Sequence, residues 1–367
     1  MMIFKLDSGD EVHRYYKSIA VIFKGERKVL STSPLNGGYR DDLRAVFNHD
    51  IKPGEGMACE LKAPTYEEHL SIIAAELGFN PDYTAGIGTA ASMENVSLIV
   101  ESYAGLSVTA IVTGGVEVNG GRAGDPATYD ERNDQGDSKE GSGTINIMLE
   151  INANLTPGAL TGALLTCTEA KSAVLQELMA PSKYSTGLAT GTGTDGTILI
   201  SNAASPISLT NAGKHAKLGE LIGRAVKKAV KEALFKQSGL DSHYQKSILR
   251  RFERYGLNEE SLWQKYCRNV QSGCKEKALF IHNLHILDRN SLLVTLGSLY
   301  IHLLDQYEWQ LLQEEEVKEG AAVILKNIKK ILNLKGKMEE PVYNEQLSQC
   351  LINSFAEVMV QATGEQD

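Results

Sequence analysis

The sequence of 367 residues lacks the features that mark several broad classes of protein. It has no run of about 18 apolar residues, so no segment is expected to span a membrane. The N-terminal stretch MMIFKLDSGDEVHRYY has no apolar signal core, which predicts a cytoplasmic protein. Positive charge is in the minority: 37 Lys and Arg face 46 Asp and Glu, and the net charge of -9 argues against nucleic acid as the main partner.

Cysteine is scarce, and its spacing excludes a disulfide framework. The five cysteines are an odd number without regular spacing, which predicts reduced thiols. Four residues of types that bind metal ions lie close together late in the chain. Their spacing departs from that of zinc fingers, so we expect no metal site there. These four residues are Cys267, Cys274, His282 and His285.

The composition changes near Ser238-Gly239, and the chain is long enough for two domains. Before this point, strand and helix patterns mix. Beyond it, glycine becomes rare and segments such as SLLVTLGSLYIHLLDQYEW have a helical period. We therefore predict a mixed domain over residues 1–237 and an all-α domain of unknown role over residues 240–367.

Two helix starts can be located in the first domain. Thr65 followed by Glu68 forms a capping box, and Gly78 closes the helix that follows. Thr156 is a candidate N-cap with Pro157 at the first helical position, and Cys167 lies on the apolar stripe of that helix. We therefore expect Cys167 to be a core residue.

A third helix, after Lys214, has one apolar face and one basic face. Between Lys214 and Arg254 there are eleven Lys or Arg and four Asp or Glu, so this segment is basic in an acidic protein. The pattern favours a solvated lysine face, with an anion-binding site as the alternative. His215, at the start of the helix, is either a cap or a residue of a functional site.

The stretch GTINIMLEIN, residues 143–152, alternates residue by residue. Its odd-numbered positions from Ile145 are apolar, whereas the other face carries Thr144, Asn146, Glu150 and Asn152. A hydroxyl, two amides and a carboxylate are what an amide-cleaving site needs to attack a carbonyl and hold the oxyanion. The alternative is a solvated sheet face. A polar loop, residues 129–142, leads directly to Thr144.

Five clusters rich in glycine or small residues accompany this strand. They lack the Gly-Lys-Ser/Thr of a phosphate loop, and none has the spacing of a dinucleotide fingerprint. Glycine lets the backbone approach a ligand closely, so together the clusters favour a binding site, although turns alone could explain any one of them. The clusters are STSPLNGG, GIGTAASMEN, VTGGVEVNGGRAGDP, GSGTINIM and STGLATGTGTDGT.

These segments, with the downstream LTNAGKHAKLGELIGRAVKKAV, resemble the adenosylcobinamide amidohydrolase family from about Ser31 to Phe235. The resemblance does not extend to residues 240–367. It implies corrinoid salvage: hydrolysis of the amide that joins aminopropanol to the corrin ring of adenosylcobinamide, giving adenosylcobyrate. The corrinoid would be the substrate, and no cofactor is expected. A corrinoid-binding carrier that cleaves nothing is the alternative from another class.

A more distant resemblance concerns the order of the motifs. A Gly-rich loop, the Gly-Thr strand, the turn and helix NLTPGALTGAL and then TGTGTDGTILIS are similar to the layout of the ornithine acetyltransferase and DmpA-type aminopeptidase group. It implies an α+β domain with two β-sheets packed between helices, an αββα-like arrangement. It also places Thr144 in the position of a nucleophile freed by self-cleavage after Gly143, against which stands a purely structural threonine.

Further candidate residues follow from the motifs. Glu94 and Asn95 could supply acid-base and oxyanion functions or simply open the next strand, and a water activated by Glu94 or Glu150 is a third mechanism. Arg122 and Asp125 form either a ligand contact or a loop-internal ion pair. We expect a small-molecule corrinoid partner, no membrane contact and a possible homo-oligomer. The expected substrate-binding residues are Ser33, Asn36, Thr89, Asn119, Arg122, Asp125, Asn146, Asn152, Thr194, Asp195 and His215.

Overall fold

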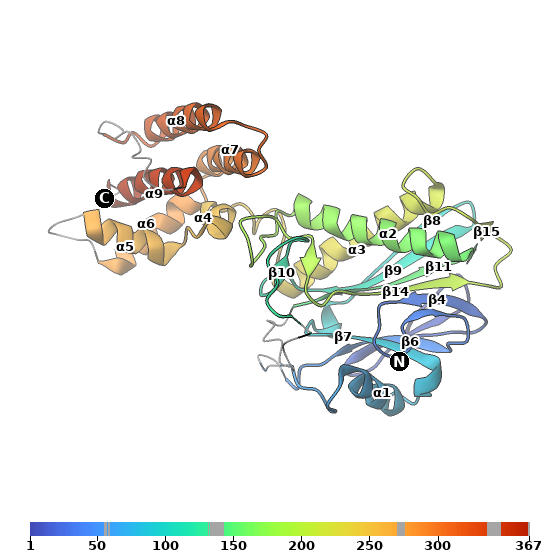
Figure 1. Ribbon diagram of the computed structural model, residues 1–367. Coiled ribbons are helices and arrows are strands. Elements are labelled where there is room, and N and C mark those ends of the chain that lie inside the picture. Colours follow the sequence, from blue (N-terminus) through green and yellow to red (C-terminus); the bar gives the residue numbers. More distant parts are fainter. Residues whose placement is uncertain are drawn as a thin grey trace. The chain divides into compact units, whose positions relative to one another are not determined.

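The computed structural model describes residues 1–54, 57, 59–130, 132, 143–269, 276–335 and 346–365. The chain forms two compact units, Met1–Asp241 and Ser242–Asp367 (Figure 1). The boundary lies within a few residues of the change in composition at Ser238-Gly239. Most of the polar loop at residues 129–142 lies outside the described residues.

The first unit contains two large β-sheets. Five strands form one sheet, in the order β1 (Met2–Lys5), β2 (Glu11–Arg14), β3 (Ser18–Ile22), β6 (Ala45–Asp50) and β7 (Thr84–Thr89). Six strands form the other, in the order β5 (Gly38–Arg40), β4 (Arg27–Ser31), β14 (Gly196–Asn202), β11 (Ile145–Ile151), β9 (Leu106–Gly114) and β8 (Ser97–Tyr103). Two short pairs complete the strands: β10 (Gly120–Gly121) with β13 (Gly191–Thr192), and β12 (Asn154–Leu155) with β15 (Ser208–Leu209).

The two sheets pack face to face between helices. Val21 and Val46 of one sheet and Met148 and Ile198 of the other share one apolar core. Helix α1 (Tyr66–Glu76) packs through its own core on the outer face of the five-stranded sheet. Helices α2 (Pro157–Glu177) and α3 (Lys217–Ser238) cover the outer face of the six-stranded sheet (Figure 1). The predicted αββα-like arrangement is confirmed.

The helix starts are those that the sequence predicts. The Thr65 hydroxyl accepts a hydrogen bond from the backbone N–H of Glu68, and the Glu68 carboxylate accepts one from that of Thr65. Thr156 caps α2, and Cys167 within α2 is fully buried. These features were predictable because a cap depends on residues that are neighbours in the sequence.

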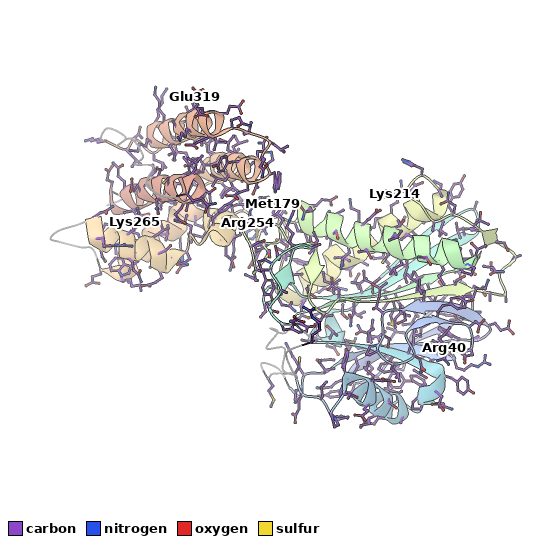
Figure 2. The ribbon with its side chains drawn as sticks, viewed as in Figure 1. Arg40, Met179, Lys214, Arg254, Lys265 and Glu319 are labelled. Atoms are coloured by element: carbon purple, nitrogen blue, oxygen red, sulfur yellow. The ribbon has the colours of Figure 1, made fainter. Side chains whose placement is uncertain are left out.

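The basic face of α3 is solvated, as predicted, and its lysines are paired with glutamates. Lys227 and Lys231 bind Glu177 of α2, and Lys214 binds Glu169 of α2 at 2.6 Å. Figure 2 shows Lys214 at the outer surface of the helical layer. These ion pairs disfavour an anion-binding site, because the positive charges already have partners.

The C-terminal unit is helical throughout its described part, as predicted. Its apolar core is formed by side chains from all of its α-helices, and Arg254 and Asp305 form a buried ion pair inside it. The helices are α4 (Ile248–Phe252), α5 (Glu259–Asn269), α6 (Lys277–Asp288), α7 (Ser291–Glu308), α8 (Glu314–Ile331) and α9 (Leu347–Glu365). A short 3-10 helix, Glu253–Tyr255, also lies in this unit, and two others, Pro81–Tyr83 and Met93–Asn95, lie in the first unit.

The described ranges contain no cluster of metal ligands and no membrane-spanning helix. Cys274 falls outside them, and the described residues contain no group of three side chains able to hold a metal ion. Among the described cysteines, Cys59 and Cys167 are free thiols. In the same ranges, no helix has the length and apolar character needed to cross a membrane.

Candidate active site

The polar face of β11 is buried between the two sheets. Thr144, Asn146 and Glu150 are 5%, 1% and 0% exposed, and Met148 on the same face belongs to the core that both sheets share. The solvated sheet face that the alternation also allowed is therefore wrong. Buried polar groups need partners, so each of these side chains is either held by hydrogen bonds or kept for another purpose.

Asn146 connects the two sheets. Its Nδ2 donates to Oδ1 of Asn48 and to the carbonyl of Gly88, both at 2.8 Å, and its Oδ1 accepts from the N–H of Gly196 at 3.0 Å. Asn48 in turn donates to the hydroxyl of Thr113 at 2.8 Å. Because its carboxamide is hydrogen-bonded within the protein, Asn146 holds the two sheets together at the site.

Thr144 lies beside Thr194. The parallel register of β11 and β14 sets Asn146 opposite Gly196, so the residues two positions earlier also face each other. Their two hydroxyl oxygens are 2.7 Å apart, and Thr194 Oγ1 donates to the carbonyl oxygen of Gly143 at 3.0 Å. Because Thr194 has a single hydroxyl proton, the Thr144 hydroxyl must be the donor between the two threonines. A hydroxyl, its hydrogen-bond acceptor and a polarised carbonyl thus lie together.

Asp195 holds this pair in place. One of its carboxylate oxygens accepts from the N–H of Ile145 at 2.9 Å and from the hydroxyl of Thr192 at 2.6 Å. The other accepts from the N–H of Thr192 and forms an ion pair with Lys171 of α2. The carboxylate therefore joins the start of β11 to the turn that carries Thr194.

Asn119 packs against the residue before Thr144. Its side chain is 1% exposed, and neither carboxamide atom has a hydrogen-bond partner in the part of the chain that the structure describes. A Cβ added to Gly143 would lie 2.4 Å from Asn119 Oδ1, so only glycine fits there. An unpaired buried amide costs stability, about 1 to 3 kcal/mol, and such a group is often retained for function.

A cleft of about 650 Å³ is lined by Gly193 and Asp195, the residues on either side of Thr194, but not by Thr194 or Thr144. In its wall, Asp125 accepts from the backbone N–H of Arg122 at 2.8 Å and from the hydroxyl of Ser182 at 2.6 Å. The contact between Arg122 and Asp125 is thus local to the loop and uses the backbone of Arg122. Side chains that line the cleft include Arg122, Asp125, Tyr129, Lys171, Tyr184 and Asp195.

Ser33, Asn36 and Thr89 support the strands around the site. The Ser33 hydroxyl binds both the N–H and the carbonyl of Gly86 in β7. Asn36 Nδ2 donates to the carbonyls of Pro81 and Thr84. Thr89, which is 1% exposed, accepts from the N–H of Ala91 through its hydroxyl. These predicted substrate-binding side chains are engaged in anchoring the backbone.

Glu94 and Asn95 lie at the edge of the site. Glu94 is a surface residue with a 76% exposed side chain and an ion pair to Arg14. Asn95 Nδ2 donates to Oε1 of Gln237 at 2.9 Å, near the end of α3. The structure does not bring either side chain to the hydroxyl of Thr144.

Glu150 and Asn152 lie at the opposite end of β11. Glu150 lies six positions after Thr144 along the strand, so the two residues are about 20 Å apart. Burial raises the pKa of Glu150 to about 7, and the charge of nearby Asp10 acts in the same direction. Asn152 Oδ1 accepts from Asn202 Nδ2 at 3.0 Å. Alternation placed these residues on the correct face, but not within reach of Thr144.

His215 is also remote from the site. It is exposed, and the N-cap of α3 is Ala216, without a side-chain hydrogen bond, so the predicted cap is wrong. The 22 residues of α3 span about 33 Å, and its far end carries Gln237, which contacts Asn95. The structure therefore separates His215 from the group around Thr144.

Sequence patterns did not reveal four residues of the site: Asn48, Thr113, Lys171 and Thr192. Lys171 is the single lysine of α2, and no local pattern marks it as a site residue. Thr192 is within the TGTGTDGT motif, and its place two residues before Thr194 was the available hint. Asn48 and Thr113 become partners only when the sheets pack together.

Comparisons with known proteins match the first unit of the chain. The family model for adenosylcobinamide amidohydrolase matches residues 3–242. An uncharacterized protein of Methanocaldococcus jannaschii is 36% identical over 231 residues, which cover 60% of this chain and 87% of that protein. The adenosylcobinamide amidohydrolase of Methanosarcina mazei is 31% identical over 230 residues, covering 60% of this chain and 96% of that protein.

Among solved structures, that of a protein from Pyrococcus horikoshii aligns with 64% of this chain and 82% of the Pyrococcus chain. The sequence identity is 15% and the TM-score is 0.30. The family match spans the whole αββα unit, including both strands that carry the threonine pair. The chain therefore belongs to the adenosylcobinamide amidohydrolase family.

Proposed function

We propose that this protein hydrolyses the amide between aminopropanol and the corrin ring of adenosylcobinamide and releases adenosylcobyrate for corrinoid salvage. Membership of the family supports the reaction type. The observation that carries the proposal is the hydrogen-bonded pair of Thr144 and Thr194, whose strand start is bound by Asp195, a residue that lines a cleft. This pair supplies a hydroxyl nucleophile that is already oriented by a hydrogen bond.

The remaining requirements of amide hydrolysis have candidates nearby. Attack by Thr144 Oγ1 on the amide carbon produces an oxyanion, and the unpaired carboxamide of Asn119 can donate to such an oxygen. The leaving aminopropanol nitrogen must take up a proton, and a freed α-amine of Thr144 would supply a base and acid close to neutral pH, with a pKa of about 8. Water then hydrolyses the ester on Thr144.

The first test is release of the product. Purified protein incubated with adenosylcobinamide should yield adenosylcobyrate and free aminopropanol, which mass spectrometry detects as separate species. A titration of corrinoid binding runs in parallel. Binding without loss of aminopropanol after long incubation would contradict hydrolysis and support the carrier alternative.

The second test concerns self-cleavage between Gly143 and Thr144. Thr194 donates to the Gly143 carbonyl and accepts from the Thr144 hydroxyl, so Thr144 Oγ1 is placed beside the carbonyl that an N-to-O acyl shift would use. The C–N bond breaks as the C–O bond forms, the nitrogen takes the proton, and water hydrolyses the ester. Intact-mass analysis should show two fragments, residues 1–143 and 144–367. A single uncut chain with full activity would remove the free amine from the mechanism.

A further inference from the structure

We infer that Lys171 of α2 is a positioning residue for the hydroxyl pair of Thr144 and Thr194, an inference that rests on the proposed function. Lys171 forms an ion pair with Asp195, and the two side chains are only 12% and 13% exposed. Lys171 also lines the cleft, so a direct contact with substrate is the competing role. The inference concerns how the pair of hydroxyls keeps its geometry.

Asp195 links the two backbone segments that carry these hydroxyls. Through the N–H of Ile145 it binds the residue next to Thr144, and through Thr192 it binds the turn next to Thr194. The hydroxyl of Thr192 also accepts from the N–H of Thr194 at 3.4 Å. The separation of the two reactive oxygens therefore depends on where the carboxylate lies.

Lys171 determines where that carboxylate lies. Its ammonium group binds the oxygen of Asp195 that also accepts from the Thr192 N–H, and it approaches from the helix that covers the sheet. Gly191 leaves room for this contact: a Cβ there would lie 2.4 Å from Asp195 Oδ2 and 2.8 Å from Lys171 Nζ. A side chain at position 191 would therefore collide with the ion pair, so the contact requires glycine there.

Removing the ammonium group should loosen the hydroxyl pair without removing either hydroxyl. For Lys171→Met we expect kcat to fall about 100-fold, the size of effect that a misplacement of about 1 Å produces. KM for adenosylcobinamide should stay within about twofold, because a positioning residue acts on the chemical step. Lys171→Arg, which keeps the charge, should restore most of kcat.

Gly191→Ala tests the same contact from its other side. The added methyl group would displace Asp195 and Lys171 while every charged and polar group remains, so kcat should fall as it does in Lys171→Met. Lys214→Met is the control. It removes an exposed lysine that likewise forms an ion pair with a carboxylate, that of Glu169 in α2, and kcat should be unchanged. Thermal melts of each variant correct kcat for the folded fraction.

The outcomes separate this inference from the proposed function. A wild-type protein that does not hydrolyse adenosylcobinamide overturns the proposed function and the inference with it. An active wild type with normal kcat in folded Lys171→Met or Gly191→Ala overturns the inference alone. A rise in KM at constant kcat also overturns it, because Lys171 would then contact the substrate in the cleft.

Discussion

Thr144→Ala is expected to lower kcat for adenosylcobinamide hydrolysis by about 10³ or more, the scale seen when the nucleophile of a catalytic group is removed. The hydroxyl of Thr144 is the one beside both Thr194 and the Gly143 carbonyl. Steady-state kinetics of the purified variant measure the loss. Thr144→Ser keeps a hydroxyl and should keep a large part of kcat.

A matched control separates chemistry from folding in this experiment. Thr166 in α2 is 5% exposed, as is Thr144, and its hydroxyl also makes one hydrogen bond inside the protein, to the carbonyl of Ala212 at 2.9 Å. Thr166→Ala should cost about 1 kcal/mol of stability and leave kcat unchanged. Near-normal kcat in Thr144→Ala would exclude Thr144 as the nucleophile.

Glu150→Gln is expected to stabilise the fold above neutral pH. Burial raises the pKa of Glu150 to about 7 from its usual value of 4.5, although the nearby hydroxyl of Ser8 acts in the opposite direction. The folded state thus holds the proton more tightly than the unfolded state. The favourable contribution of the protonated acid is complete below pH 4.5 and is lost as pH rises through 7.

The difference in pKa corresponds to about 3 kcal/mol between these two limits. Denaturant unfolding at several pH values measures it. At pH 8 Glu150→Gln should exceed the wild type by about this amount relative to their difference at pH 4, where both side chains are neutral. Parallel stability curves for the two proteins from pH 4 to 8 would show that folding does not raise the pKa of Glu150.

The remoteness of Glu150 from Thr144 affects the mechanism as well. A water activated by Glu150 was one interpretation of the alternating strand, because both side chains share one face. That face extends along the whole of β11, and about 20 Å of strand separates its two ends. The same carboxylate therefore bears on stability, whereas the candidate nucleophile lies at the other end of the strand.

The elements that the sequence determined by itself depend on residues close together in the chain. The capping box at Thr65, the cap at Thr156, the alternation of residues 144–152 and the helical C-terminal unit all follow from local patterns. The motifs also predicted the family and the αββα-like fold. The cap at His215 was a local expectation that failed, because α3 begins at Lys217 and its N-cap is Ala216, which makes no side-chain hydrogen bond.

Only the tertiary structure decided which polar residues meet. Thr144 and Thr194 come together because β11 and β14 pair in parallel, a register that no local pattern encodes. Lys171 reaches Asp195 because α2 packs on the same sheet. Strand alternation assigns a side chain to one face of its sheet, but the partner across that face, and the burial that shifts a pKa, are set by contacts between residues far apart in the chain.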